Sequence, residues 1–393
     1  MVPSFLVYAL LYGTLFALMA MGLTLTYMTT KVPNFAYGSF VTVGLYTAFN
    51  MKIYYNLNPY YSVPFAFVVA GIVSVIMYVG VLRPLARRGT PLVALMIATF
   101  AVDIGFIGII GIYTDYIQNK FPNTGLGSPK QFFALPGDFT LYGIPGLTYV
   151  APLVLAGITL SIYLLFTRTR FGIAMRASVE NPSLANVLGI NVERVNVVSW
   201  LLAGGFAGVA GSLYVLQFPG GTSTGSDLIV NIFAASVLGG LTSIFGAVVG
   251  GLVIGSSADI VTTELDLGFG YAGASLIAAL AFAIGAWVIW RRLRLQRAKN
   301  GGSGGASLFS RKVLFSGQGI GGILLFLLGI YILLEMATGF STDFFVMGLV
   351  NGYGADVTPY QQAVPLLIMV ATLLLIPKGI VSLNLGRLRR KGR

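Results

Sequence analysis

The amino-acid sequence predicts an all-α, polytopic transmembrane bundle with about ten membrane spans and a broken or re-entrant helix near residues 228–242. Its composition supports this fold class, because 56% of the 393 residues are hydrophobic, only 9% are charged, and the mean hydropathy is +0.86. Soluble domains carry roughly a quarter charged residues. Apolar runs of about 20 residues, the length that crosses a bilayer as a helix, recur along the chain.

Each apolar run of this length is a predicted span. The first run has no basic segment before it, so we expect it to be a retained helix rather than a signal peptide. The predicted spans are residues 4–28, 36–55, 62–82, 91–113, 148–167, 196–217, 243–262, 271–290, 314–337 and 361–377.

Basic residues gather in alternate loops, which the positive-inside rule assigns to the cytoplasm. These loops cover Arg83–Arg88, Arg168–Arg194, Arg291–Lys312 and Lys378–Arg393. The opposite loops carry acidic residues and few basic ones. The formal net charge of +12 therefore reflects membrane topology and not nucleic-acid binding. The N-terminus is then expected outside.

The apolar run 228–241 is too short for an upright span at 1.5 Å per residue. Both the 168–195 loop and the 291–313 loop must lie inside, so this run has to return the chain to the cytoplasmic side. We therefore predict a broken or re-entrant pair over 228–262. Gly239 and Gly240 are its predicted hinge. Such irregular backbone is tolerated only where protein or a water-filled cavity surrounds it.

The loop from Arg168 to Trp200 is a long polar interruption that contains its own short helix. Asn181 can act as the N-cap, Pro182 suits the first helical position, and Gly189 can take the left-handed position after the last turn. This predicts a helix over 182–188 with Leu184, Val187 and Leu188 on one side. A helix so short needs a surface to dock on, either the membrane face or a partner subunit.

The residue inventory argues against an enzyme. The chain contains no cysteine and no histidine, which removes thiolate chemistry, the usual general base and the commonest metal ligand. We find no paired carboxylates on one helix face. We expect no catalytic residue, no metal site and no cofactor bound by this chain.

Two polar residues within or between the predicted spans are candidate functional residues. Asp103 falls within the 91–113 span and should face protein or water, either lining a permeation path or bonded within the bundle. Asn34 belongs to a turn that leaves backbone groups in need of partners. Asn34 and Asp103, together with Phe35, Tyr37 and Gly38, are the candidate lining of a translocation path.

Several ordered motifs resemble the branched-chain amino acid ABC-transporter permeases. The stretch ALMAMGLTLTYMTTKVPNFAYGSFVTVG, from Ala17 to Gly44, contains the family's Asn-Phe-Ala-x-Gly turn at residues 34–38. Arg83-Pro84-Leu85 follows, and then RTRFGIAMRASVENPSLANVLGIN, AGGFAGVAGSLYV and AASVLGGLTSIFGAVVGGLVIG. The sequence Leu375–Ile380 resembles the family's closing Pro-x-Gly turn.

This resemblance implies a membrane subunit of an ATP-driven importer in the plasma membrane of a prokaryote. It implies a second permease subunit, two cytoplasmic ATPase subunits that use the ATP, and an extracytoplasmic binding protein. By the same likeness, the 178–190 loop is the helix that couples to an ATPase subunit. The matching positions are Glu180, Asn181, Ala185, Gly189 and Ile190, to which the apolar side adds Leu184 and Leu188.

The sequence departs from the family in two places. The variable position of the Asn-Phe-Ala-x-Gly turn is commonly His in that family but is Tyr37 here, which does not titrate near neutrality. Residues 263–358 form an apparent extra helix pair with a Gly-rich cytoplasmic linker at 291–313. The predicted domains are thus a permease core (1–262) with its loop at 168–195, the extra pair, and a final helix with a basic tail (359–393).

Two alternatives remain open at this point. An ion-coupled secondary transporter could use Asn34, Asp103 and the 228–243 break as an ion site, although the capped loop would then have no role. A permease for urea or short amides would keep the importer architecture. We expect branched-chain or other hydrophobic amino acids as the solute, because few fixed charges are available to offset the desolvation of a multiply charged one.

Overall fold

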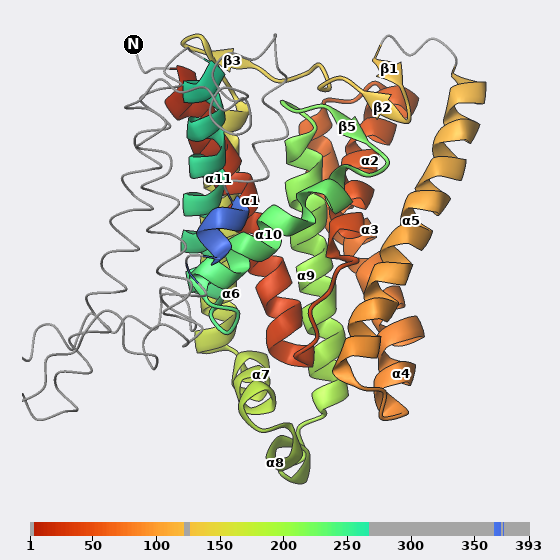
Figure 1. Cartoon of the computed structure of the whole chain (residues 1–393), viewed down its shortest axis with the longest axis vertical. Helices are drawn as coiled ribbons and strands as arrows, with labels where there is room; N and C mark the ends of the chain where they lie inside the picture. The colour runs from red at the N-terminus through yellow and green to blue at the C-terminus, as the bar shows by residue number, and fades with distance from the viewer. Residues whose placement is uncertain (1–3, 122–125, 267–364, 371, 373–393) are drawn as a thin grey trace, which may run out of the picture. The chain divides into compact units, whose positions relative to one another are not determined.

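A computed structural model describes residues 4–121, 126–266, 365–370 and 372 of the chain (Figure 1). The chain divides into two compact units, Met1–Ser257 with Lys378–Arg393, and Ala258–Pro377. The first unit holds all the sites discussed below. Its long helices are α1 (Ser4–Thr30), α2 (Tyr37–Tyr55), α3 (Ser62–Met77), α5 (Leu92–Lys120), α6 (Leu147–Arg168) and α9 (Val192–Tyr214). The shorter elements are a 3-10 turn (Pro59–Tyr61), a π-helical segment (Tyr78–Leu82), α4 (Arg83–Arg87), α7 (Arg170–Glu180), α8 (Pro182–Val187) and α10 (Thr224–Gly239). α11 spans Ile244–Asp266.

Five helical segments within the described residues are long and apolar enough to cross a membrane: Val7–Thr30, Pro59–Arg87, Leu92–Lys120, Leu147–Arg168 and Val192–Tyr214. These correspond to five of the predicted spans. The predicted span 36–55 is present as α2, whose 19 residues include several polar ones. Its burial among other helices explains that composition, since Tyr37, Phe40, Val41, Leu45 and Phe49 are fully buried.

α1 and α9 form the centre of the bundle. Within an apolar 18-residue window of each helix, 94% of the α1 window and 78% of the α9 window is buried. The corresponding shares are 22% for α5 and 17% for α6. Glycines permit α2 to approach α9 closely, because a Cβ on Gly44 of α2 would lie 2.1 Å from the carbonyl oxygen of Gly208 in α9. Small residues let membrane helices gain backbone contact where no hydrophobic drive is available.

Close contacts show the relative directions of α1, α9 and α11. α1 and α9 are antiparallel, since Gly22 lies against Ala203 while Tyr12 packs on Tyr214 with ring centroids 6.3 Å apart. α1 and α11 are also antiparallel, since Ala17 lies against Gly251 and Gly13 against Gly255. Because α9 and α11 therefore run the same way, α10 must carry the chain back between them.

The predicted helix break at 239–243 is present. α10 ends at Gly239, Gly240 has φ +95°, and α11 begins at Ile244. A Cβ on Gly239 would lie 2.1 Å from the carbonyl oxygen of Gly246, so the two helices meet almost backbone to backbone beside the turn. α10 starts at Thr224, earlier than the apolar run, because the polar Thr-Gly-Ser-Asp stretch forms its first turn.

The described part of the chain is not purely helical. β1 (Gly127–Ser128), β2 (Gln131–Phe132) and β5 (Gly220–Gly221) form an antiparallel sheet in the order β1-β2-β5, and β3 (Thr140–Leu141) pairs with β4 (Ile144–Pro145). Two-residue strands are too short to show a period of two in the sequence. α5 also runs to Lys120, beyond the predicted end at 113, because its last turns continue as a polar helix.

Three predictions lie wholly or largely outside the described residues. These are the extra helix pair at 263–358 with its Gly-rich linker, the last three spans of the predicted ten, and the basic C-terminal tail. The final predicted span contributes the helical residues 365–370 and 372.

Candidate functional site

The short helix α8 is capped at both ends as the sequence predicts. The Leu184 amide donates to Asn181 Oδ1 at 3.0 Å, and Pro182 occupies the first turn, where no amide donor is needed. At the other end Gly189 has φ +82°, its amide donates to the Asn186 carbonyl at 3.0 Å, and the Ile190 amide donates to the Ala185 carbonyl at 2.9 Å. These two bonds form a Schellman motif, which pairs carbonyls that a helix end leaves free.

The apolar side of α8 points away from the protein. Leu184 is 55% exposed, Val187 84% and Leu188 69%, whereas Ala185 is 1% exposed and faces the bundle. Glu180, Asn181 and Gly189 are exposed, and Ile190 is half-buried against the core. The seven positions predicted to couple therefore divide: Ala185 and Ile190 hold α8 in place, and Leu184 and Leu188 present its outer surface.

α8 is held by two capped neighbours. Thr169 Oγ1 accepts from the Gly172 amide at 3.1 Å and starts α7, and Asn191 Oδ1 accepts from the Arg194 amide at 3.0 Å and starts α9. A Cβ on Gly172 would lie 2.3 Å from the Leu165 carbonyl oxygen, so α6 and α7 meet at a tight corner. A side-chain N-cap thus sets the start of each of α7, α8 and α9. These fixed starts determine where α8 projects (Figure 1).

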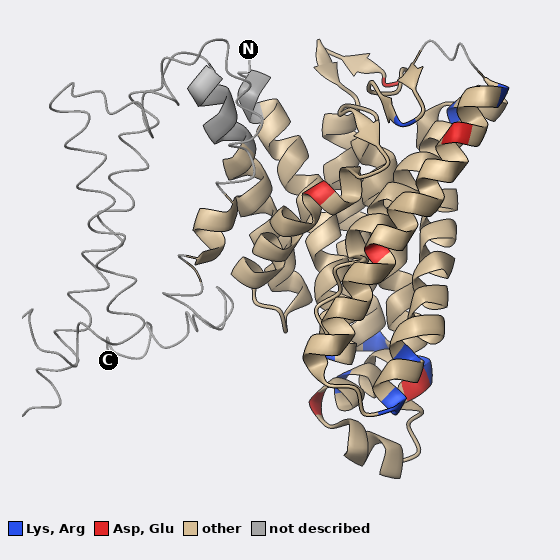
Figure 2. Cartoon of the chain, turned by 45° about the vertical axis from the view of Figure 1, so that its right-hand side comes forward, with Lys and Arg blue, Asp and Glu red and all other residues tan. Residues whose placement is uncertain are grey.

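Among the described residues, Lys and Arg lie towards the two ends of the bundle, whereas some acidic residues lie between the ends (Figure 2). At the end that carries α8, Arg83 Nε and Arg87 Nη2 pair with Glu193 in the first turn of α9, the second contact at 2.8 Å. This pairing places the basic 83–88 loop and the 168–195 loop at the same end, as the charge pattern predicts. At the other end Lys130 pairs with Asp115 at 2.8 Å.

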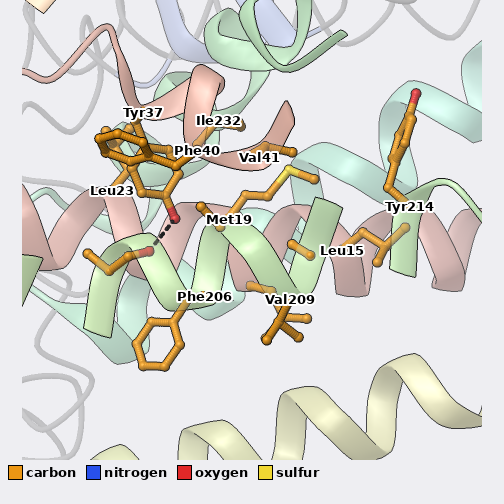
Figure 3. Close-up of a cluster of buried hydrophobic side chains, with 14 of the residues drawn as sticks. Leu15, Met19, Leu23, Tyr37, Phe40, Val41, Phe206, Val209, Tyr214 and Ile232 are labelled. Carbon is orange, nitrogen blue, oxygen red and sulfur yellow. Dashed lines mark hydrogen bonds between the residues drawn. The ribbon is translucent and has the colours of Figure 1, made fainter. Parts of the chain in front are cut away.

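The second candidate region lies around the Asn-Phe-Ala-x-Gly turn, in the bundle interior. Residues 31–36 form no helix between α1 and α2. The Tyr37 hydroxyl donates to the Ala203 carbonyl of α9 at 3.3 Å, and its ring lies among Leu23, Phe40 and Ile232 (Figure 3). A Cβ on Gly38 would lie 2.3 Å from the Gly225 carbonyl oxygen, so the start of α2 touches the start of α10.

α5 supplies two polar contacts to this turn, one helical turn apart. The Phe35 amide donates to Thr99 Oγ1 at 3.1 Å, and Ser39 Oγ donates to Asp103 Oδ1 at 2.5 Å. Asp103 is 4% exposed. Of the two roles left open for Asp103, this geometry favours a hydrogen bond within the bundle. Asn34 is fully buried, and neither atom of its carboxamide has a hydrogen-bond partner among the described residues.

Comparison with known proteins shows the family to which this helical membrane protein belongs. The chain matches the family described as "Branched-chain amino acid transport system / permease component" over residues 5–267. The chain belongs to this family. A probable branched-chain amino acid transport permease protein LivH of Methanocaldococcus jannaschii is 43% identical over 263 residues, which is 67% of this chain and 82% of that protein.

Two further relatives are less similar to this permease than that LivH protein. BraD of Pseudomonas aeruginosa, a high-affinity branched-chain amino acid transport system permease protein, is 30% identical over 272 residues, covering 64% of this chain and 83% of BraD. The ribose import permease protein RbsC of Bacillus subtilis is 32% identical over 168 residues, covering 41% of this chain and 49% of RbsC. No solved structure matches the permease.

The structure adds contacts that the sequence does not indicate. Thr24 of α1 and Ser236 of α10 share a hydrogen bond at 2.5 Å inside the permease. Phe233, also on α10, packs on Phe35 with ring centroids 5.1 Å apart. Partners so far apart in sequence carry no local pattern. The described residues contain no group of three or more Asp or Glu side chains placed to hold a metal ion together.

Proposed function

We propose that this permease is the membrane-spanning subunit of an ATP-binding-cassette importer and that α8 docks on a cytoplasmic ATPase subunit. The exposed apolar side of α8 carries this proposal. Leu184, Val187 and Leu188 are more than half exposed on a helix that is capped at both ends. Exposed leucines on a rigid, short helix fit a groove on a partner protein.

The position of α8 favours docking over the bilayer-surface alternative. Figure 1 shows α8 at the extremity of the molecule, beyond the ends of the long helices. A helix that lay on the bilayer would stay level with those ends, at the depth of the lipid headgroups. An ion-coupled secondary transporter gives this projecting helix no task.

The arginines at the α8 end suggest which side of the membrane it occupies. Arg83, Arg87, Arg168, Arg170 and Arg176 all precede or flank α8 and α9, and such basic loops are kept in the cytoplasm. The partners that follow are a second permease subunit, two ATPase subunits and an extracytoplasmic binding protein. ATP is bound by the ATPase subunits, and the complex lies in the plasma membrane of a prokaryote.

We propose branched-chain or other hydrophobic amino acids as the solute. The named substrates of the relatives that match most of this chain support this choice. Ribose is a weaker candidate, since the ribose permease matches only 41% of the chain.

The test is the substitution Leu188→Asp in the complete importer, assembled in proteoliposomes with its ATPases and binding protein. A carboxylate in an apolar groove is costly to desolvate, so uptake of leucine and co-purification of the ATPases should both fall by at least tenfold. Ser183→Asp adds the same charge to the first turn of α8, where a helix tolerates it, and serves as the control. Wild-type uptake in the Leu188 variant, or uptake driven by an ion gradient without ATP, would reject the proposal.

A further inference from the structure

Among the buried polar side chains of the described residues, Asn34 differs from the others in having both polar atoms of its carboxamide unpaired. The side chain is 0% exposed, and both Oδ1 and Nδ2 lack a hydrogen-bond partner among the described residues. In folded proteins the great majority of buried side-chain polar atoms have such a partner, and leaving one unpaired costs the desolvation of that group. An amide with two unpaired polar atoms therefore destabilises this conformation.

Three polar groups close to Asn34 in the sequence are, in contrast, paired. The next amide along the chain, that of Phe35, donates to Thr99, and the Tyr37 hydroxyl donates to Ala203. One turn into α2, Ser39 donates to Asp103. Single unpaired atoms also remain on α10, at Ser226 Oγ and Asn231 Oδ1, but among the described residues Asn34 is the side chain with both polar atoms unpaired.

Asn34 also adjoins an aromatic cluster built from three elements. The ring of Phe35, from the non-helical segment, lies 5.1 Å from that of Phe233 on α10 and 6.4 Å from that of Phe100 on α5. α10 is the helix that ends at the Gly239–Gly240 break, and its first turn contacts the start of α2 through Gly225. Asn34 therefore directly precedes a residue of this cluster, in a turn whose end at Gly38 meets the start of α10 at Gly225.

Building on the proposed function, we propose that Asn34 is a solute-contact residue. When α10 separates from residues 31–36, Oδ1 accepts from the α-ammonium group of an amino acid and Nδ2 donates to its α-carboxylate. Phe35, Phe100 and Phe233 contact the apolar side chain of the solute. A neutral amide that offers both a donor and an acceptor suits a zwitterion, and the aromatic rings supply apolar surface without a fixed charge.

This assignment makes stability and transport respond in opposite directions. Asn34→Leu keeps the approximate volume of the side chain and removes its unpaired polar atoms, so the unfolding temperature of the permease should stay the same or rise. Uptake of leucine by the complete importer in proteoliposomes should fall at least tenfold. ATP hydrolysis stimulated by the liganded binding protein should stay within about twofold, since α8 is untouched.

Two comparisons isolate the role of the amide. Asn34→Ser and Asn34→Ala are similar in size, and only Ser keeps a donor and an acceptor, so the Ser variant should retain several-fold more uptake. Asn196→Leu removes an amide that is paired, since Asn196 Nδ2 donates to the Tyr78 hydroxyl at 3.1 Å. The Asn196 variant should lower the unfolding temperature, whereas Asn34→Leu should not.

Uptake by Asn34→Leu within twofold of wild type would overturn the inference, as would equal uptake by the Ser and Ala variants. A fall in unfolding temperature as large as that of Asn196→Leu would also overturn it, because Asn34 would then have a structural partner. The wild-type complex tests the proposed function separately. If it takes up no amino acid in the presence of ATP, the proposed function is rejected, whatever the variants show.

Discussion

The left-handed residue that ends α8 offers a direct test of coupling, through the substitution Gly189→Val. Gly189 has φ +82°, and a Cβ added there would meet nothing within 4 Å. The substitution therefore creates no clash and acts only through backbone conformation. A non-glycine residue pays about 1–2 kcal/mol in the left-handed region, and a β-branched one is a stronger outlier.

The free-energy cost of Gly189→Val can be bounded for each of the two conformations that the valine can adopt. If the substituted valine keeps the left-handed conformation, α8 carries that strain. If the valine leaves that conformation, the bonds from residue 189 to Asn186 and from Ile190 to Ala185 are lost, at about 0.5–1.5 kcal/mol each. Both routes weaken the capped state by about 1–3 kcal/mol, and each 1.4 kcal/mol is a tenfold change in population. A helix of 6 residues has little stability of its own to absorb this.

The assay compares Gly189→Val with Gly189→Asn, which is similar in size and tolerates the left-handed conformation. We expect ATP-driven uptake and ATPase co-purification to fall at least fivefold for the valine variant and by less than twofold for the asparagine variant. The thermal unfolding of the membrane bundle should be the same in both, because Gly189 is exposed. Equal activity in the two variants would refute the reasoning that the shape of α8 transmits coupling.

Three further predictions concern the interior and the linker. Gly208→Ala should lower the unfolding temperature by several degrees, because its Cβ would lie 2.3 Å from a backbone oxygen of α3, and overpacking costs about 1–3 kcal/mol; Gly108→Ala, with nothing within 4 Å, should leave that temperature unchanged. Asp103→Leu should destabilise the bundle by about 1–3 kcal/mol by stranding the Ser39 hydroxyl, while Asp103→Asn keeps an acceptor and should retain both stability and uptake. Deleting Gly301–Gly305 should leave uptake unchanged, since the family match ends at residue 267; transport lost without loss of folding would contradict this.

The features that local chemistry determines are the ones the sequence predicts well. The cap at Asn181, Pro182 and the left-handed Gly189 are all readable over nine residues, because each partner lies within one helical turn. The break at Gly239–Gly240 is predictable for the same reason, from paired glycines and a run too short to span. The charge pattern likewise predicts that the 83–88 and 168–195 loops share one end, and the pairing of Arg83 and Arg87 with Glu193 confirms this for these two loops.

The features that depend on distant partners are not predictable in this way. An aspartate within an apolar span is compatible with a path or with a structural bond, and only its contact with Ser39, 64 residues away, distinguishes them. The unpaired state of Asn34 is likewise a property of everything packed around it. The start of α10 escapes prediction because its first turn is polar, and polarity near a helix start looks like loop when the contact between Gly225 and Gly38 is unknown.

α9 relates the two candidate regions to each other. Its first turn holds Glu193 beside α8, and its middle accepts the Tyr37 hydroxyl at Ala203, next to the Asn-Phe-Ala-x-Gly turn. Between these points the Trp200 carbonyl accepts from Ser74 of α3 at 2.8 Å. Because α9 has no break over its 23 residues, we expect it to move as a unit. A displacement of α8 by a partner would therefore reach the interior turn by tilting or sliding α9, with no need for a chain of separate side-chain rearrangements.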